Sequence, residues 1–96
     1  MLRFEWDDRK AASNQRRHKI SFEEARSVFF DEEALLISDD EHSSHEDRFI
    51  IIGISVTLRV LVVCHCYRES NEIIRIISAR KATRFEARQY QKRLEQ

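Results

Sequence analysis

The sequence contains no proline and a single glycine, Gly53, among its 96 residues. Several familiar signatures need more than one glycine: the G-x-G-x-x-G fingerprint, the P-loop and the G-x-S-x-G nucleophile turn. None of these can be present in this chain. Apolar residues make up 42% of the chain, so the sequence predicts a compact fold rather than a disordered segment.

Cysteines and long apolar runs are also scarce. Cys64 and Cys66 are two residues apart on an expected strand, so they share a face and are badly placed to bridge each other. Buried thiols in a reducing cytosol are therefore expected. No stretch reaches the ~20 apolar residues that cross a bilayer, and no signal peptide is expected, which excludes a membrane protein.

Charge is balanced over the whole chain but not along it. The net charge is zero, yet residues 31–47 hold eight Asp or Glu and no Lys or Arg. Residues 73–96 hold seven Lys or Arg against two Glu. This asymmetry indicates an anionic partner for the C-terminal part of the chain.

Helices are expected where capping residues precede a helical pattern. Asp7 can cap a first helix, whose apolar residues are Ala11 and Ala12, so we expect that helix on the surface. Ser21 and Glu24 have the spacing of a capping box for a second helix. An apolar stripe at helical spacing supports this second helix and consists of Phe22, Ala25, Val28 and Phe29.

Apolar and alternating segments predict five strands, at residues 3–6, 34–38, 48–56, 59–68 and 72–79. Thr83 and Glu86 form a further capping box, which opens a C-terminal helix. The short links favour antiparallel neighbours. The sequence thus predicts one α+β domain over residues 1–96. Its antiparallel four- to five-stranded sheet has two N-terminal helices and a C-terminal helix against one face, with the other face partly open.

Strict alternation along the last two strands places several polar side chains. His65 and Tyr67 share a face with Leu61 and Val63, which predicts a shallow cleft rather than core or plain surface. On the last strand the same rule puts Arg80 on one face, together with Ile74, Ile76 and Ser78. It puts Arg75 on the other face.

Arginine, histidine and tyrosine side chains suit RNA. A guanidinium holds two phosphate oxygens at once, and a tyrosine ring stacks on an unpaired base. Arg, Lys, His and Tyr can also divide the proton transfers and charge stabilisation of RNA cleavage without a metal or nucleotide cofactor. A plainer interpretation stays open: Arg75 can pair with a neighbouring carboxylate. Arg84, Arg88 and Lys92, at helical spacing, can form a solvated helix face.

A metal site is the alternative chemistry. His42 and His45 lie among carboxylates in the segment "DDEHSSHED", and H-x-x-H with nearby acids can bind zinc. The segment lacks a helical frame for the two imidazoles, so we expect no metal site here.

Several segments, taken together, resemble the BrnT family of bacterial type II toxins, ribonucleases with a RelE-like fold. The resemblance runs from Phe4 to about Tyr90. It is carried by "FEWDDRKAASN" (4–14), "RHKISFEEA" (17–25), a "DxxHSxxEDRF" segment ending at Phe49, and "IRIISARKATRFEARQY" (74–90). It implies metal-independent RNA cleavage that arrests translation and growth. It also implies a ribbon-helix-helix antitoxin and promoter DNA bound through the toxin–antitoxin complex.

The resemblance also assigns roles to residues. Arg80 in "SAR" matches the family directly, and we expect it to be catalytic together with four further residues: Arg17, His18, Tyr67 and Arg75. The expected RNA contacts are Arg68, Lys81, Arg84 and Arg88. The family usually has K-H-G where this chain has Arg17, His18 and Lys19, and often Glu-Arg where Glu69 is followed by Ser70. Arg17 keeps the positive charge of the lysine but not its capacity for proton transfer.

The leading hypothesis is therefore a cytoplasmic ribonuclease toxin. A degenerate, non-catalytic relative that binds its antitoxin and modulates transcription is the alternative, and a plain protein-interaction domain is a third. Growth arrest on expression, relieved by co-expression of the neighbouring gene, separates the first hypothesis from the others.

Overall fold

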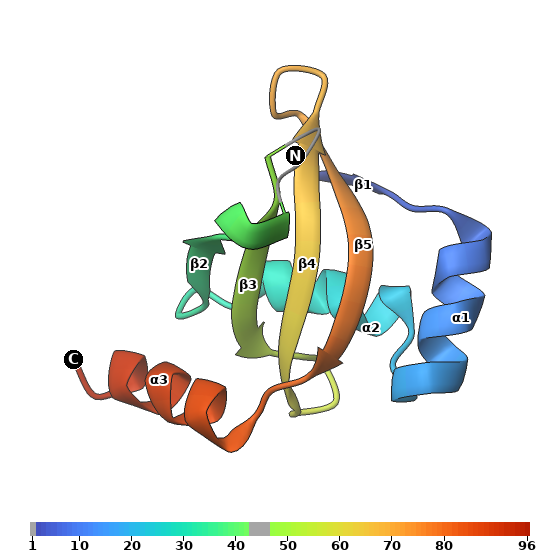
Figure 1. The fold of residues 1–96 in the computed structure, drawn as a ribbon. Coiled ribbons are helices and arrows are strands. Elements are labelled where there is room, and N and C mark those ends of the chain that lie inside the picture. The colour runs from blue at the N-terminus through green and yellow to red at the C-terminus, as the bar shows by residue number, and fades with distance from the viewer. Residues whose placement is uncertain (1, 43–46) are drawn as a thin grey trace.

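The computed structural model describes residues 2–42 and 47–96 of the chain (Figure 1). The helices and strands follow in the order β1 (Arg3–Glu5), α1 (Asp8–His18), α2 (Phe22–Ser27), β2 (Leu35–Ser38), β3 (Phe49–Ile54), β4 (Val60–Arg68), β5 (Ile73–Lys81) and α3 (Arg84–Leu94). Short 3-10 turns lie at Val28–Phe30 and Asp40–His42. The order of strands and helices agrees with the order predicted from the sequence.

The strands form a five-stranded sheet in the order β1-β5-β4-β3-β2. The α+β class is confirmed, but a wholly antiparallel sheet is wrong, because β1 pairs with β5 in parallel. A chain that leaves β1 through two helices and three further strands can return on either side of it, and the strand pattern does not fix the direction. None of the described helices is long and apolar enough to cross a membrane.

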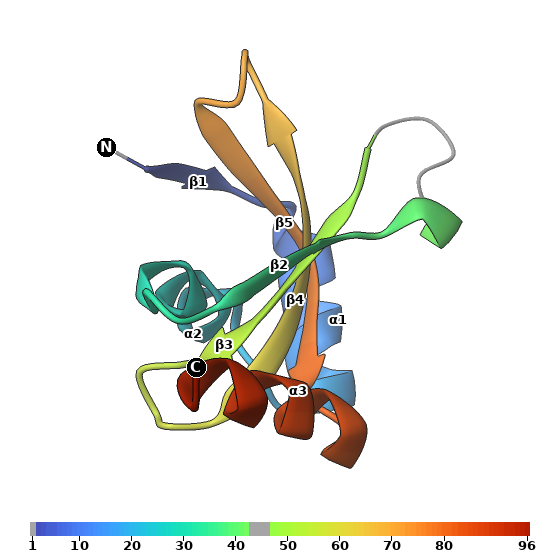
Figure 2. The same ribbon diagram turned by 90° about the vertical axis from the view of Figure 1, so that its left-hand side faces the viewer.

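The helices lie on both faces of the sheet, not on one as expected. Figures 1 and 2 show α2 across one face and α3 beneath the end where β5 finishes. The core on the α2 side includes Phe22, Leu61 and Val63. On the other side Tyr90 of α3 packs on Ile52 and Val62. Because α3 covers only one end of its face, the rest of that face is available for a site.

The single glycine, Gly53, lies where residues between α2 and β2 pack closely against β3. A Cβ atom at Gly53 would lie 2.9 Å from the Cβ of Ala34 and 3.0 Å from Asp31 Oδ2. Asp31 Oδ2 accepts hydrogen bonds from the Ile54 N–H (2.8 Å) and the Tyr90 hydroxyl (2.5 Å). The close approach at Gly53 thus lets one carboxylate tie β3 to α3.

The caps of the helices are largely as predicted. The Asp7 side chain accepts from the N–H groups of Arg9 and Lys10, which lowers the pKa of Asp7. Thr83 and Glu86 form the full capping box of α3. At α2 the Ser21 side chain accepts from the Glu24 N–H as expected, but no hydrogen bond is found from the Ser21 N–H to the Glu24 carboxylate. That half of the predicted box is wrong.

Glu24 instead joins α2 to the β3–β4 turn. Its buried carboxylate forms a two-pronged ion pair with Arg59 and accepts from the hydroxyls of Ser55 (2.7 Å) and Thr57 (2.5 Å). These hydrogen bonds, that of Arg59 first, lower the pKa of Glu24 to about 2. A buried carboxylate is tolerated only when it is paired and hydrogen-bonded in this way.

A bulge in β5 changes which side chains share a face. Cys64 pairs with Ser78 but His65 pairs with Ile76, so Ile77 is an extra residue in β5. Ile76 and Ala79, three positions apart, therefore both enter the core under α1 and α2. The predicted grouping of Arg80 with Ile74 and Ile76 is wrong, since the bulge reverses the alternation before Arg80. It places Arg80 and Arg75 on the same side of the sheet.

Asn14 of α1 holds β5 just beyond the bulge. Its side chain accepts from the Ala79 N–H (3.0 Å) and donates to the Ala79 carbonyl (2.9 Å) and the Ile20 carbonyl (3.0 Å). Asn14 is buried, although the sequence indicated a helix that merely lies on the surface. The Asn14 amide thus makes the hydrogen bonds to Ala79 that a neighbouring strand would make, because β1 pairs only with residues 73–75 of β5.

We predict that Asn14→Ala lowers the free energy of unfolding by about 1–3 kcal/mol, the usual cost of leaving a buried polar group without a partner, here the backbone of Ala79. Chemical denaturation measures this loss. The matched control is Gln15→Ala, an exposed neighbour in the same helix, which should change stability by less than about 0.5 kcal/mol. Equal stability of Asn14→Ala and the wild type would contradict the role of Asn14.

Candidate active site

Two adjoining hollows lie on the side of the sheet that Arg80 faces. The first, of about 220 Å³, is lined by Asp39, Arg48, Ile50, Val62, Cys64, Ile77, Ser78 and Arg80. The second, of about 140 Å³, is lined by Lys10, Ser13, Asn14, Arg17, His18, Ile77 and Ser78. Ile77 and Ser78 belong to both hollows. We call the combined surface the basic groove, because arginine, lysine and histidine side chains approach it from α1, from β5 and from Arg48, the residue before β3.

Arg80 is held at the groove by a carboxylate. Its NH1 and NH2 groups donate to Glu86 Oε1 (2.7 Å) and Oε2 (2.9 Å), and NH1 also approaches the Lys81 carbonyl (3.4 Å). Glu86 is the carboxylate that caps α3 by accepting from the Thr83 N–H (2.8 Å). The bidentate pair raises the pKa of Arg80 and lowers that of Glu86 to about 2. The guanidinium is therefore oriented by a helix start, with 42% of its side chain still exposed.

The two hollows carry charge that a phosphate would find favourable. Arg48 and Lys10 both act electrostatically on the half-buried thiol of Cys64. Burial nevertheless raises the pKa of Cys64, and Asp39 adds to the rise, so the thiol stays protonated at neutral pH. Cys66 is buried, and no disulfide joins the two cysteines. Cys64 therefore supplies no reactive thiolate to the groove. The charged side chains that line the groove are mostly cationic.

Arg17 and His18 come from the last turn of α1, where Arg17 is exposed and His18 half-buried. Lys19 ends that helix in the left-handed conformation, with φ of 61° and ψ of 34°. A glycine adopts this conformation without steric cost, which explains the physical use of the glycine that the family usually has here. Lysine takes the same backbone shape, so Arg17 and His18 keep their place at the groove.

Tyr67 and His65 lie on the other face of the sheet. His65 is 0% exposed, and its ring packs edge-on against Phe29 at 4.8 Å between centroids. Burial lowers the pKa of His65 to about 4, so it is neutral at physiological pH. The cleft predicted for this face of β4 is found only in part: Tyr67 lines a hollow together with Leu36 and Phe49, whereas His65 is buried and does not line it. The structure does not bring Tyr67 together with Arg80.

The other basic residues singled out from the sequence are spread over the surface. Arg75 is paired with Glu5 of β1 at 2.5 Å, the plainer interpretation given above. Arg68 is exposed at the end of β4, away from Arg80. Lys81 directly follows Arg80, and Arg84 and Arg88 are exposed on α3. Of these, Lys81 is the nearest in the chain to the groove.

Lys10, Arg48 and Ser78 line the groove but were missed in the sequence. A signal was available for Lys10, because Lys10, Asn14 and Arg17 lie at i, i+4 and i+7 on one helical face. The contribution of Arg48 depends on the pairing of β3 with β4, which local sequence does not reveal.

No cluster of His, Cys, Asp and Glu among residues 2–42 and 47–96 is arranged to hold a metal ion. The alternative metal site at His42 and His45 cannot be placed, because His45 lies outside the described residues.

These features define a class: a small α+β domain with a cationic groove on the open part of one sheet face. Residues 6–86 match the family described as ribonuclease toxin, BrnT, of type II toxin-antitoxin system. The chain therefore belongs to the BrnT family of ribonuclease toxins, which confirms the resemblance seen in the sequence. Membership implies an RNA substrate and an antitoxin protein as partner.

The fold is similar to that of the Brucella abortus ribonuclease toxin, BrnT, in its 1.1 Å crystal structure. The TM-score is 0.66 at 21% sequence identity, and the match covers 88% of this chain and 100% of the Brucella chain. At 21% identity the comparison shows a shared fold and nothing further about this chain. No curated protein sequence matches the chain.

The Arg80–Glu86 pair predicts a pH-dependent contribution to stability. The pKa of Glu86 falls from an ordinary 4.5 to about 2 on folding, so the pair stabilises the protein above about pH 4.5 and ceases to do so as the pH falls toward 2. Glu86→Gln should thus cost about 1 kcal/mol at neutral pH, a modest value because Arg80 is partly exposed.

Denaturation curves of both proteins between about pH 7 and about pH 3 test this linkage, and the gap between them should narrow as the pH falls. The exposed Glu32→Gln variant is the control and should follow the wild type. A gap that is constant over this range would show that the Glu86 carboxylate is not the titrating group.

Proposed function

We propose that the chain is a metal-independent endoribonuclease that cuts RNA in the basic groove. The observation that carries the proposal is the shared position of Ser78. It joins the hollow of Arg80 to the hollow of Arg17 and His18. RNA phosphates crossing β5 at Ser78 would meet a bidentate donor on one side and an imidazole on the other. Tyr67 and Arg75 are left out of this constellation, because Tyr67 faces away and Arg75 is paired with Glu5.

The residues divide the reaction as follows. A neutral imidazole nitrogen is a proton acceptor, so His18 receives the proton of the ribose 2′-hydroxyl as that oxygen attacks phosphorus. The bond from phosphorus to the 5′ oxygen breaks, giving a 2′,3′-cyclic phosphate. Lys10 supplies the proton that the departing 5′ oxygen needs. Arg80 stabilises the extra negative charge that builds up on the phosphoryl oxygens. Arg17 contributes charge but no proton.

Glu86 has a positioning role in this scheme. A guanidinium that must be arranged afresh for each substrate loses part of its value, whereas one fixed in advance stabilises charge without reorganisation. The Glu86 carboxylate fixes Arg80 from one side, at 2.7 Å and 2.9 Å, and leaves the Nε side for phosphate. RNA on either side of the cleaved bond would be held by exposed basic side chains, those of Arg68, Lys81, Arg84 and Arg88.

In the cell we propose a cytoplasmic, single-domain toxin over residues 1–96, whose cutting of RNA arrests translation and growth. A ribbon-helix-helix antitoxin would neutralise it by covering the groove, and the complex would bind promoter DNA.

Two observations favour the second candidate function, a non-catalytic co-regulator that binds the antitoxin. Arg80 is paired with Glu86 in the manner of a structural brace, and Arg17 stands where the family usually has a lysine capable of proton transfer. Expression in bacteria separates the two: a ribonuclease arrests growth until the antitoxin is co-expressed, whereas a co-regulator does not.

We predict that purified protein cuts single-stranded RNA in excess EDTA, since His18, Lys10 and Arg80 perform the chemistry. The products should carry 2′,3′-cyclic phosphate or 3′-phosphate ends, which gel mobility after phosphatase treatment reveals. A substrate with a 2′-deoxy sugar at the cleaved position should stay intact. Loss of all cutting on chelation would overturn the mechanism and return attention to His42 and His45.

We predict that Arg80→Ala lowers the cleavage rate on the order of 10²–10³-fold, about 2.7–4 kcal/mol, the usual cost of a lost preorganised donor. Arg80→Lys should rescue little, because one ammonium does not replace a bidentate fork.

Glu86→Gln is the matched control, since it breaks the same ion pair but keeps the guanidinium. It should lose stability comparable to that of Arg80→Ala, but its cleavage rate should fall clearly less, because the guanidinium is still present although it is no longer fixed in advance. A well-folded Arg80→Ala protein that cuts at the wild-type rate ends the proposal.

A further inference from the structure

The outer edge of β2 is unprotected. β2 is the last strand of the sheet, and its far side pairs with no other strand of the described chain. Natural edge strands usually carry charges, proline or a bulge that prevent another chain from pairing with them. β2 reads Leu-Leu-Ile-Ser and has none of these, and its pairing with β3 is regular from Leu35 to Ser38.

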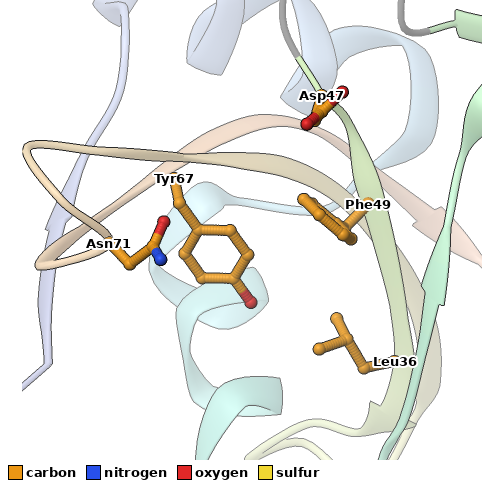
Figure 3. A pocket seen from close by; sticks show the side chains of 5 residues that line it. All are labelled: Leu36, Asp47, Phe49, Tyr67 and Asn71. Carbon is orange, nitrogen blue, oxygen red and sulfur yellow. The ribbon is translucent and has the colours of Figure 1, made fainter.

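Apolar side chains are exposed on both faces of this strand. Leu36 is 55% exposed and Ile37 is 40% exposed. Beside Leu36 opens a hollow of about 570 Å³, with Phe49 and Tyr67 as its aromatic lining. Figure 3 shows Leu36, Phe49 and Tyr67 turned toward the same space, with Asp47 and Asn71 at its border. The volume is sufficient for a large side chain from a partner.

The charges around this edge exclude RNA as its ligand. Glu32 and Glu33 precede β2, Asp40 and Glu41 follow it, and Asp47 borders the hollow; all are exposed. Glu33 has Arg93 as a distant ion partner at 3.9 Å. Phosphates would be repelled from such a surface, whereas a basic peptide would be attracted to it. We call Leu36, Ile37, Phe49 and Tyr67, with these flanking carboxylates, the β2 edge surface.

We propose that the β2 edge surface is where the antitoxin anchors itself, through an extended segment that carries basic residues and a large apolar side chain. The inference rests on the proposed function in taking the antitoxin as the partner. The segment adds a strand to β2, and alternate side chains reach opposite faces of the sheet. One apolar side chain enters the Phe49–Tyr67 hollow. Lysines or arginines at the ends of the segment meet the flanking carboxylates.

The position of β2 explains how such an anchor would inhibit the enzyme. Ile37 pairs with Ile50, and Ile50 lines the basic groove. A segment lying along β2 is thus one strand away from the site, on a surface that RNA does not need. The antitoxin can hold on to this surface firmly while a second part of it covers the groove. β2 offers four residues for pairing, so the apolar anchor supplies much of the affinity.

The test compares the affinity of the purified cognate antitoxin, encoded by the adjacent reading frame, for the wild type and for Leu36→Lys/Ile37→Lys. Both positions are exposed, so the variant should fold, which its melting curve verifies. We expect its dissociation constant to rise at least about 100-fold. Leu58→Lys is the matched control, because Leu58 is an 80% exposed apolar residue in the β3–β4 turn; it should bind as the wild type does.

A second readout separates this inference from the proposed function. The double variant should cut RNA at the wild-type rate, since neither residue lines the groove, but should no longer be inhibited by an equal amount of antitoxin. Wild-type affinity of the double variant overturns the inference even if RNA cleavage is confirmed. A wild-type protein that dimerises through this edge, with the double variant monomeric and still inhibited, overturns it too. Absence of RNA cleavage by the wild type overturns the proposed function alone.

Discussion

The register of β5 on either side of Ile77 decides which side chains meet at the basic groove. In a regular strand Ile76 and Ala79 would point to opposite faces, and one of the two would leave the core. The extra residue at Ile77 lets both stay buried and turns Arg80 toward the open side. Asn14 then holds Ala79 by its backbone N–H and carbonyl, so the new register is fixed from α1. The same contact brings the end of α1, with Arg17 and His18, to the groove.

The cationic surface and the acidic, apolar surface lie on different parts of one small sheet. The groove gathers cationic groups from α1, from β5 and from Arg48 before β3, whereas the outer edge at β2 is apolar with carboxylates at both of its ends. The net charge of zero conceals this division, because the acidic and basic stretches cancel in the sum. An RNA substrate and a basic protein segment would therefore be drawn to different parts of the molecule. The separation allows a partner to bind tightly without imitating RNA.

Much of the fold could be predicted from local sequence. The caps at Asp7 and Thr83 and the order of strands and helices are local features, and the structure has them. The parallel pairing of β1, the bulge at Ile77 and the partner of Glu24 are contacts between distant residues, which period-two reasoning does not contain. That reasoning consequently misplaced Arg80 and put the buried His65 beside Tyr67 in a cleft that only Tyr67 lines. Arg80 was nevertheless predicted as a site residue, because the prediction used its sequence motif and not the strand face on which it lies.

The most direct test of the account is the mapping of RNA on the protein by NMR. An RNA with a 2′-deoxy sugar at the cleaved position binds without being cut, so backbone amide shifts can be followed during a titration. The account predicts shifts at Lys10, His18, Cys64, Ser78 and Arg80, the residues that the bulge and Asn14 bring to one surface. Shifts confined to the Phe49–Tyr67 hollow and the β2 edge, with the groove unaffected, would contradict it.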